Sequence, residues 1–199
     1  MYQDIGGRFE AGAHCDRGLI TWPVVTDTQP DSPLTPELED AIRVGYEQRD
    51  RRKMAPTIAY FRELLSEHPD NPVLVYEVGG AYDTAGEEET ARGYYERALA
   101  MGLAGDVRRR CLCQYGSTLR WLGRLEESLA VLDDAQAEFP NSESVHVFRA
   151  LTLLDSGRGD QAASELLGTL LDHADETDLG RWAEGLRGLA GWLATGRPD

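Results

Sequence analysis

The chain is poor in several residue types that mark particular classes of protein. Lys53 is the only lysine, three of the 199 residues are cysteines, and the net charge is −15. Three cysteines in a chain of this length do not make a disulfide framework, which fits a reducing compartment. The strong negative charge repels phosphate backbones and argues against binding to DNA or RNA. Because arginine replaces lysine almost throughout, we expect a G+C-rich bacterial origin.

Long hydrophobic runs are also missing. No uninterrupted apolar stretch approaches the ~18–20 residues that a membrane-spanning helix needs, so no membrane partner is expected. The first twenty residues carry charges, among them Asp4, Arg8 and Glu10, between glycines. They contain no apolar core of the kind found in a secretory signal. We therefore expect a cytoplasmic protein.

The sequence shows no recognisable catalytic or metal-binding constellation. Cys111 and Cys113 lie two residues apart on a predicted helix, so their side chains point roughly 200° apart and cannot share one metal ion. Residues 14–16, His-Cys-Asp, are metal-capable types in one short segment, which makes a poor site. The glycines of residues 185–191 do not follow a strand, as a phosphate-binding loop requires. We expect no metal, no cofactor and no enzymatic activity.

What the sequence does contain is a pattern of small and large residues that recurs at steps of 34, 37 and 34. Three series follow these steps: Gly45, Gly79, Gly116 and Ala150; Thr57, Ala91, Ser128 and Ala162; and Phe61, Tyr95, Leu132 and Leu166. A period in this range is the signature of a helical solenoid.

Helical periodicity begins at Thr35, which can cap the first N–H groups of a helix that has proline in its first turn. Short breaks rich in Gly, Pro, Asn or Asp then separate apolar stretches with helical spacing. The helices are expected near residues 35–50, 55–68, 71–85, 88–102, 106–122, 125–139, 142–156, 159–174 and 177–195. No segment has the alternation of a half-buried strand.

The strongest motifs lie in the second and third repeats. They comprise Val75, Val78, Gly79, Tyr82, Gly86, Ala91, Tyr95 and Ala98, and then Leu112, Tyr115, Gly116, Leu119, Gly123, Ser128, Leu132, Ala135 and Pro140. On these residues the chain resembles the tetratricopeptide repeat family. Segments 76–82 and 114–120 are similar to short, stand-alone bacterial members. The first and fourth repeats follow the pattern more loosely.

The resemblance implies an all-α, right-handed superhelical solenoid of antiparallel helix pairs. The expected repeats are 38–71, 72–108, 109–142 and 143–176, within a solenoid that covers 35–199. From their prolines and small polar residues, residues 1–34 are expected to be a flexible arm outside the repeats. Three extra residues near 102–105 should lengthen a turn. The helix at 177–195 is expected to cap the array with a polar outer face, or alternatively to form an oligomer interface.

In this family the first helix of each repeat lines a concave groove. The corresponding residues are Tyr46, Arg49 and Asp50; Tyr76, Gly80 and Asp83; Arg110, Cys113, Ser117, Arg120 and Trp121; and Val147, Leu151, Leu154 and Asp155. Gly80 and Ser117 leave room for a ligand, while Tyr76 and Trp121 supply the aromatic surface that is common in binding hot spots.

Arg110 and Arg120 are prominent in so acidic a chain, because arginine captures carboxylates with two parallel hydrogen bonds. They favour acidic partners, although the alternative is that they pair with Asp83 and Glu77 on neighbouring helices. The Lys and Asn residues of the family's carboxylate clamp are missing, so capture of a chaperone tail is not implied.

These observations predict a non-catalytic module that binds a peptide or helix of a protein partner in the groove. The alternative is a scaffold that self-associates, as a homo-oligomer, through the capping helix or the outer face. A third possibility is that the arm, with Trp22, folds back into the groove as an internal ligand.

Overall fold

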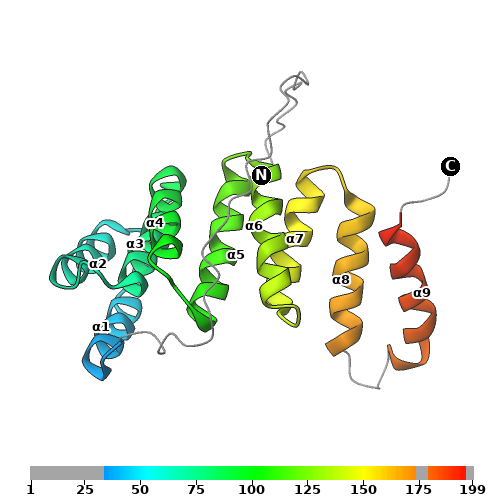
Figure 1. The fold of residues 1–199 in the computed structure, drawn as a ribbon, viewed down its shortest axis with the longest axis horizontal. Helices are drawn as coiled ribbons and strands as arrows, with labels where there is room; N and C mark the ends of the chain where they lie inside the picture. Colours follow the sequence, from blue (N-terminus) through cyan, green and yellow to red (C-terminus); the bar gives the residue numbers. More distant parts are fainter. Residues whose placement is uncertain (1–33, 174–178, 196–199) are drawn as a thin grey trace.

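The computed structural model describes residues 34–173 and 179–195, and from α1 to α8 each helix is joined to the next by a short connection (Figure 1). The arm predicted at 1–34 lies outside this range apart from Leu34. The elements are α1 (Pro36–Glu47), α2 (Ala55–Glu67), α3 (Pro72–Thr84), α4 (Glu88–Ala100), α5 (Gly105–Trp121), α6 (Leu125–Glu138), α7 (Glu143–Asp155), α8 (Gly159–His173), the 3₁₀ turn η1 (Gly180–Trp182) and α9 (Ala183–Ala194). No strand occurs among the described residues, as expected for a helical solenoid.

The helices stand side by side in chain order, with α1 and α2 at one end of the array and α9 at the other (Figure 1). Each helix packs against the next one in the sequence, and α5 also packs against α3 and α7. The first helices of successive pairs therefore approach one another closely. The candidate groove positions lie on α1, α3, α5 and α7, the first helices of these pairs.

Small residues on the first helices fit against large residues on the second helices. A Cβ atom added to Gly79 would lie 2.9 Å from the Tyr95 ring, and one added to Gly116 would lie 2.6 Å from Cγ of Leu132. Real Cβ atoms do not come this close to a neighbour, so these positions require glycine. The recurring small and large series are thus contacts between paired helices.

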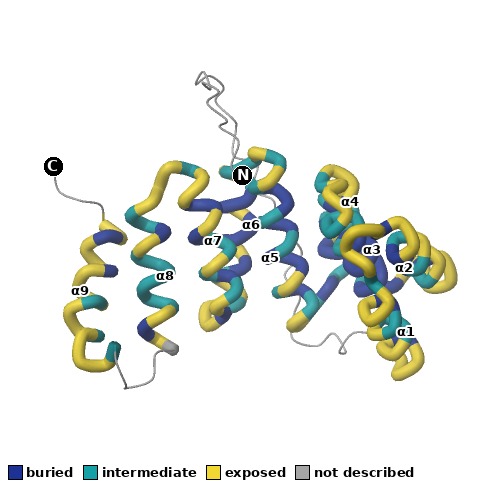
Figure 2. Tube along the Cα trace, turned by 180° about the vertical axis from the view of Figure 1, so that it is seen from behind, coloured by how far each residue is buried: buried dark blue, intermediate teal, exposed yellow. Residues whose placement is uncertain are grey.

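One large hydrophobic core runs from α1 to α7, and a second, smaller one joins α6, α7 and α8 around Leu153 and Ala162. The buried residues are concentrated in the middle of the array, while the helices at its two ends are largely exposed (Figure 2). Tyr95 and Tyr115 are the largest fully buried side chains of the main core. The middle of the array is consequently its best packed part.

The extra residues of the 37-residue step lie within a helix, and the expectation of a longer turn was wrong. The connection between α4 and α5, residues 101–104, is as long as those at 68–71 and 139–142. Instead α5 has 17 residues, whereas α3 and α7 have 13 each. The insertion thus adds about one turn to α5, since a helical turn holds 3.6 residues.

The C-terminal segment also departs from the expected single helix at 177–195. The described part consists of η1 and α9, and Ala190 and Leu193 of α9 are buried against α8. Trp182, Leu189 and Trp192 are exposed. The exposed part of this segment therefore combines these apolar side chains with the charged Glu184 and Arg187.

Candidate functional site

The candidate groove begins on α1 and α3, where an aromatic ring covers a buried carboxylate. The Tyr46 hydroxyl donates a hydrogen bond to Oε2 of Glu77, which is only 4% exposed. The Arg49 guanidinium lies over the Tyr46 ring, 5.0 Å from its centroid, in a cation–π contact. Tyr46 and Arg49 thus form the surface at this end of the groove, and Glu77 lies beneath them.

Burial dominates the electrostatics of Glu77. Desolvation raises its pKa to about 7, although the Tyr46 hydrogen bond and the positive charges of Arg110 and Arg49 act in the opposite direction. Sequence reasoning named Glu77 only as a partner for the arginines. Its burial depends on how α1 packs against α3, which residue spacing alone does not reveal.

Gly80 and Asp83 continue the groove along α3. A Cβ added to Gly80 would meet only the Tyr95 hydroxyl, at 3.9 Å, so the space above this residue is open. Asp83 accepts hydrogen bonds from Thr118 at 2.9 Å and from the Tyr95 hydroxyl at 3.4 Å. Desolvation raises the pKa of Asp83, and these two hydrogen bonds oppose the rise. Asp83 therefore ties α3 to α4 and α5.

Two of the predicted groove residues contribute little surface. Tyr76 is 4% exposed, because its ring packs 6.1 Å from that of Tyr95. Cys113 is 3% exposed, and its thiol lies 3.9 Å from the Ser144 hydroxyl of α7. The expectation that Tyr76 supplies exposed aromatic surface is thus corrected: it is part of the core beneath the groove.

The two arginines of α5 differ in their surroundings. Arg110 is half exposed and pairs at 3.1 Å with Asp106, one turn earlier in the same helix. Arg120 pairs at 2.7 Å with Asp155 of α7, and its guanidinium carbon lies 4.9 Å from the centroid of the Trp121 ring. Arg120 does pair with an acid on a neighbouring first helix, as the alternative supposed. The acid is Asp155, however, and not Asp83 or Glu77.

The other end of the groove is an exposed apolar surface. Trp121 is 69% exposed, and on α7 Val147, Leu151 and Leu154 are 39%, 36% and 48% exposed. The three α7 residues follow one another at i, i+4 and i+7, so they share one face of the helix. Arg120 touches both Trp121 and Asp155, which places the tryptophan beside the end of this stripe. Ser117 is half-buried on α5. We call Trp121, Val147, Leu151 and Leu154 the apolar groove surface.

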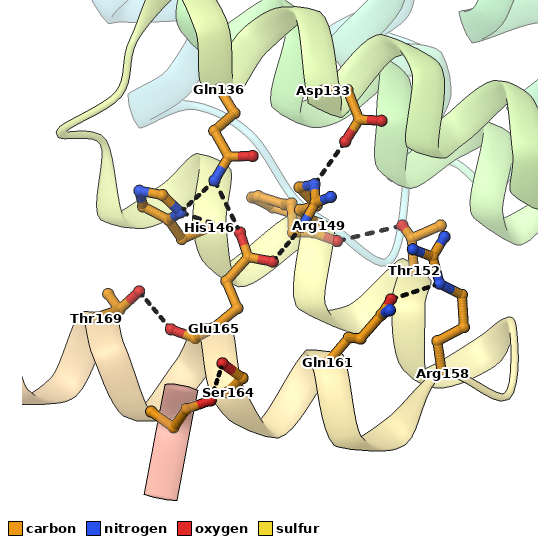
Figure 3. Close-up of polar contacts among 12 residues, drawn as sticks. Asp133, Gln136, His146, Arg149, Thr152, Arg158, Gln161, Ser164, Glu165 and Thr169 are labelled. Carbon is orange, nitrogen blue, oxygen red and sulfur yellow. Dashed lines mark hydrogen bonds and ion pairs between the residues drawn. The ribbon is translucent and has the colours of Figure 1, made fainter. Parts of the chain in front are cut away.

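A second candidate site is a cavity of about 590 Å³ between α6, α7 and α8. Polar side chains in its lining include Gln136, His146, Glu165, Thr169 and Asp172. Figure 3 shows Glu165 at the centre of a network that joins the three helices. The sequence analysis did not identify this cavity, because its lining residues come from three different helices.

The network leaves Glu165 well compensated. Its carboxylate pairs with Arg149 at 2.6 Å and lies 3.0 Å from Nδ1 of His146, and Arg149 also pairs with Asp133 at 2.6 Å (Figure 3). Nε2 of His146 faces the Pro140 carbonyl oxygen at 3.0 Å. Buried charges in such a network hold helices in a fixed arrangement. This cluster therefore has a structural role that its geometry explains.

Metal chemistry finds no support in the part of the chain that the structure describes. Within residues 34–173 and 179–195, no three His, Cys, Asp or Glu side chains form a group that could hold a metal ion. Cys111 and Cys113 are free, buried thiols, and burial raises the pKa of both.

None of the described helices is long and apolar enough to cross a membrane.

Comparison with known families agrees with this architecture. The family model described as Tetratrico peptide repeat matches residues 72–184, which is more than half of the chain. No curated protein matches the sequence. The matched region contains α3 to α8, where the glycines fit against Tyr95 and Leu132. The chain therefore belongs to the tetratricopeptide repeat family.

Proposed function

We propose that this protein binds a segment of a protein partner in the groove formed by α1, α3, α5 and α7. Tetratricopeptide repeat proteins are generally non-catalytic scaffolds for protein–protein interaction, and the match supports that role in general. The observation that carries the groove proposal is the apolar groove surface on α5 and α7. Contiguous exposed apolar residues on a soluble protein mark interaction sites.

The spacing of this surface supports an extended peptide or a helix as the bound element. Val147, Leu151 and Leu154 form a straight stripe along α7, and Trp121 stands beside its end. An amphipathic helix presents apolar residues at the same spacing and can lie along such a stripe. Tryptophan at the centre of an interface contributes more binding energy than most residue types.

The charges at the other end of the groove favour acidic groups on the partner. Arg49 lies on the surface above Tyr46, and Arg110 is half exposed with only an exposed aspartate of its own helix beside it. Exposed ion pairs of this kind are weak, so a carboxylate of a partner can replace Asp106 at Arg110. Arg120 contributes less to such selection, because Asp155 already pairs with it.

Capture of partners from a cell lysate tests the groove. Immobilised wild-type protein is compared with Leu151→Glu and with the double variant Arg120→Glu, Trp121→Ala. Both variants are expected to lose most of the captured partner. Leu151→Glu places a charge in the apolar groove surface, and the double variant removes its tryptophan ring. Leu170→Glu, an exposed position on α8 that is 52% accessible, is the matched control. Equal capture by all four proteins contradicts the groove proposal.

A second function, a scaffold that self-associates, is favoured by one observation. Trp182, Leu189 and Trp192 are exposed at the C-terminal end of the array, where an ordinary cap is polar. Analytical ultracentrifugation tests self-association directly. A protein that remains monomeric at 200 µM is not such a scaffold.

A further inference from the structure

We propose that protonation of Glu77 strengthens the binding of a partner's carboxylate groups to Arg49 and Arg110, and so makes recognition in the groove depend on pH. This regulation rests on the proposed function of the groove and deepens it, since it names the residue that controls the charged end. Glu77 is buried, so it acts on the partner through the two arginines.

Glu77 lies on α3, between the two arginines. Its carboxylate accepts a hydrogen bond from the Tyr46 hydroxyl, and the Arg49 guanidinium carbon lies 5.0 Å from the centroid of the Tyr46 ring. Arg49 and Arg110 both act on the carboxylate as nearby positive charges. Arg110 itself pairs with the exposed Asp106 and is half exposed. The two arginines therefore flank Glu77, and Arg110 also faces the solvent.

The surroundings of Glu77 favour its uncharged form. Moving an ionised carboxylate out of water is costly unless hydrogen bonds and opposite charges replace the water fully. The Tyr46 hydroxyl supplies one hydrogen bond, and the charges of Arg110 and Arg49 offset the desolvation only in part. The pKa of Glu77 is raised to about 7 as a result. Glu77 thus gains or loses its charge close to neutral pH.

The other titratable groups that interact with Glu77 keep one charge state in this range. They are Tyr46 of α1, Tyr76 of α3 and Cys111 of α5, and burial raises the pKa of each. These three side chains are therefore uncharged near neutral pH, whereas arginine remains positive. Glu77 is consequently the member of this cluster whose charge changes between about pH 6 and 8.

The charge of Glu77 changes the electrostatic attraction that an acidic partner meets. When Glu77 is protonated, Arg49 and Arg110 present two positive charges at this end of the groove. When Glu77 is ionised, its negative charge offsets one of them, and it repels a second carboxylate nearby. Salt screens charges at such short range only weakly when one of them is buried. A partner's carboxylate is therefore bound more tightly below pH 7 than above it.

The coupling works in both directions. If protonation of Glu77 strengthens carboxylate binding, a bound carboxylate raises the pKa of Glu77 by the same free energy. Binding near pH 7 then takes up a fraction of a proton. A purely structural role for Glu77, such as holding Tyr46 in place, does not require this uptake.

A titration of the full chain with N-acetylglutamate tests the regulation, because both carboxylates of this compound stay ionised from pH 6.0 to 8.0. NMR of ¹³C-labelled arginine side chains follows Arg49 and Arg110, whose signals are assigned with Arg49→Lys and Arg110→Lys. In wild type, the half-saturating concentration is expected to be at least threefold lower at pH 6.0 than at pH 8.0.

Two variants separate Glu77 from other sources of pH dependence. Glu77→Gln cannot ionise, so it is expected to bind N-acetylglutamate equally at both pH values. Asp106→Asn is the matched control, since it releases Arg110 from its exposed partner and leaves Glu77 unchanged. It is expected to bind more tightly than wild type at both pH values and to keep the threefold ratio.

The carboxyl ¹³C signal of Glu77 in wild type gives a second measurement that needs no substitution in the core. Its titration midpoint is expected to rise when N-acetylglutamate saturates the groove. A midpoint that does not move overturns the coupling, even if Glu77→Gln proves too unstable to study.

The outcomes distinguish this regulation from the function on which it rests. Binding to Arg49 and Arg110 that is equal at the two pH values in wild type overturns the role of Glu77 and leaves the selection of acidic groups in place. A ratio that persists in Glu77→Gln assigns the pH dependence to other groups and also overturns that role. Arginine signals that do not respond at either pH overturn both. None of these results bears on capture of partners at the apolar groove surface.

Discussion

The glycines in the middle of this array and those at its C-terminal end have opposite relations to their neighbours. Gly79 and Gly116 lie against Tyr95 and Leu132 so closely that no other residue fits. Gly185 and Gly188 of α9 have open space where a side chain would be. The comparison shows that glycine alone does not reveal close packing. A large residue sixteen positions later, on the paired helix, distinguishes the two cases.

The aromatic residues also fall into two groups, one buried in the core and one exposed at the surface. Tyr95 and Tyr115 are buried in the main core, whereas the three tryptophans among the described residues are exposed: Trp121 at the end of α5, Trp182 in η1 and Trp192 on α9. Tryptophan is usually well buried on average. The buried tyrosines therefore hold the array together, whereas the tryptophans lie at its surface.

The largest effect on stability is expected from a substitution that tests this difference between buried and exposed aromatic residues. Tyr95→Ala is expected to lower the free energy of unfolding by about 4 kcal/mol, because it leaves a large cavity between α3, α4 and α5. Trp121→Ala is expected to lower it by less than about 1 kcal/mol, since most of that ring is exposed. Urea denaturation followed by circular dichroism measures both. Similar losses for the two variants contradict the division.

The next effect concerns pH and the buried carboxylate beneath Tyr46. The pKa of Glu77 is raised in the folded state from 4.5 to about 7, so the folded state binds the proton more tightly than the unfolded state. The resulting contribution to stability is complete below pH 4.5 and is lost as the pH rises to about 7. The loss is at most about 3 kcal/mol, given 1.36 kcal/mol per pKa unit.

Glu77→Gln is the matched variant for this measurement, because it keeps the shape of the side chain and cannot ionise. The difference in stability between wild type and variant is expected to change between pH 4.5 and 7 and to be constant above about pH 8. Thermal denaturation across this range records it. A difference that does not vary with pH contradicts the burial of an ionisable group at this position.

A pair of identical substitutions sharpens the comparison of the glycines. Gly116→Ala is expected to lower the free energy of unfolding by about 1–2 kcal/mol, because the new Cβ overlaps Leu132. Gly188→Ala is expected to raise it by about 0.5–1 kcal/mol through helix propensity alone. Denaturation at low protein concentration keeps dimer formation out of the measurement. Effects of the same sign refute the steric interpretation.

The smallest expected effect compares how helices begin in the two regions. The Asn71 side chain accepts hydrogen bonds from the Val73 and Leu74 N–H groups at the start of α3, while α9 begins at Trp182 without a side-chain cap. Asn71→Ala is expected to cost about 1 kcal/mol. Asn71→Asp, which retains an acceptor oxygen, serves as the control and is expected to stay within about 0.5 kcal/mol of wild type.

The sequence predicts the fold well because the repeat places the same contact in every helix pair. Gly79 and Tyr95 are sixteen residues apart, as are Gly116 and Leu132, and both pairs touch. Gly123 ends α5 with a positive φ of 73°, where a break was expected. Such features depend on local spacing and backbone geometry, which the order of residues contains.

The details of the candidate site were less predictable, because they depend on which helices pack together. Cys113 has a groove position by register, yet α7 covers it. Arg120 finds its partner 35 residues later, on the next first helix, rather than on the preceding one. The exposure of Trp182 in η1 likewise depends on tertiary packing.

The extra turn of α5 affects where the chain can be cut. An insertion placed in a connection makes an exposed loop, and exposed loop tips are the usual sites of proteolytic nicking. In this chain the added residues are helical, and Arg108 and Arg109 near that turn bind Glu138 of α6 and Ser144 of α7. These helical residues leave no long loop at the junction between the second and third repeats, so we expect limited proteolysis not to divide the array at the place where its period changes.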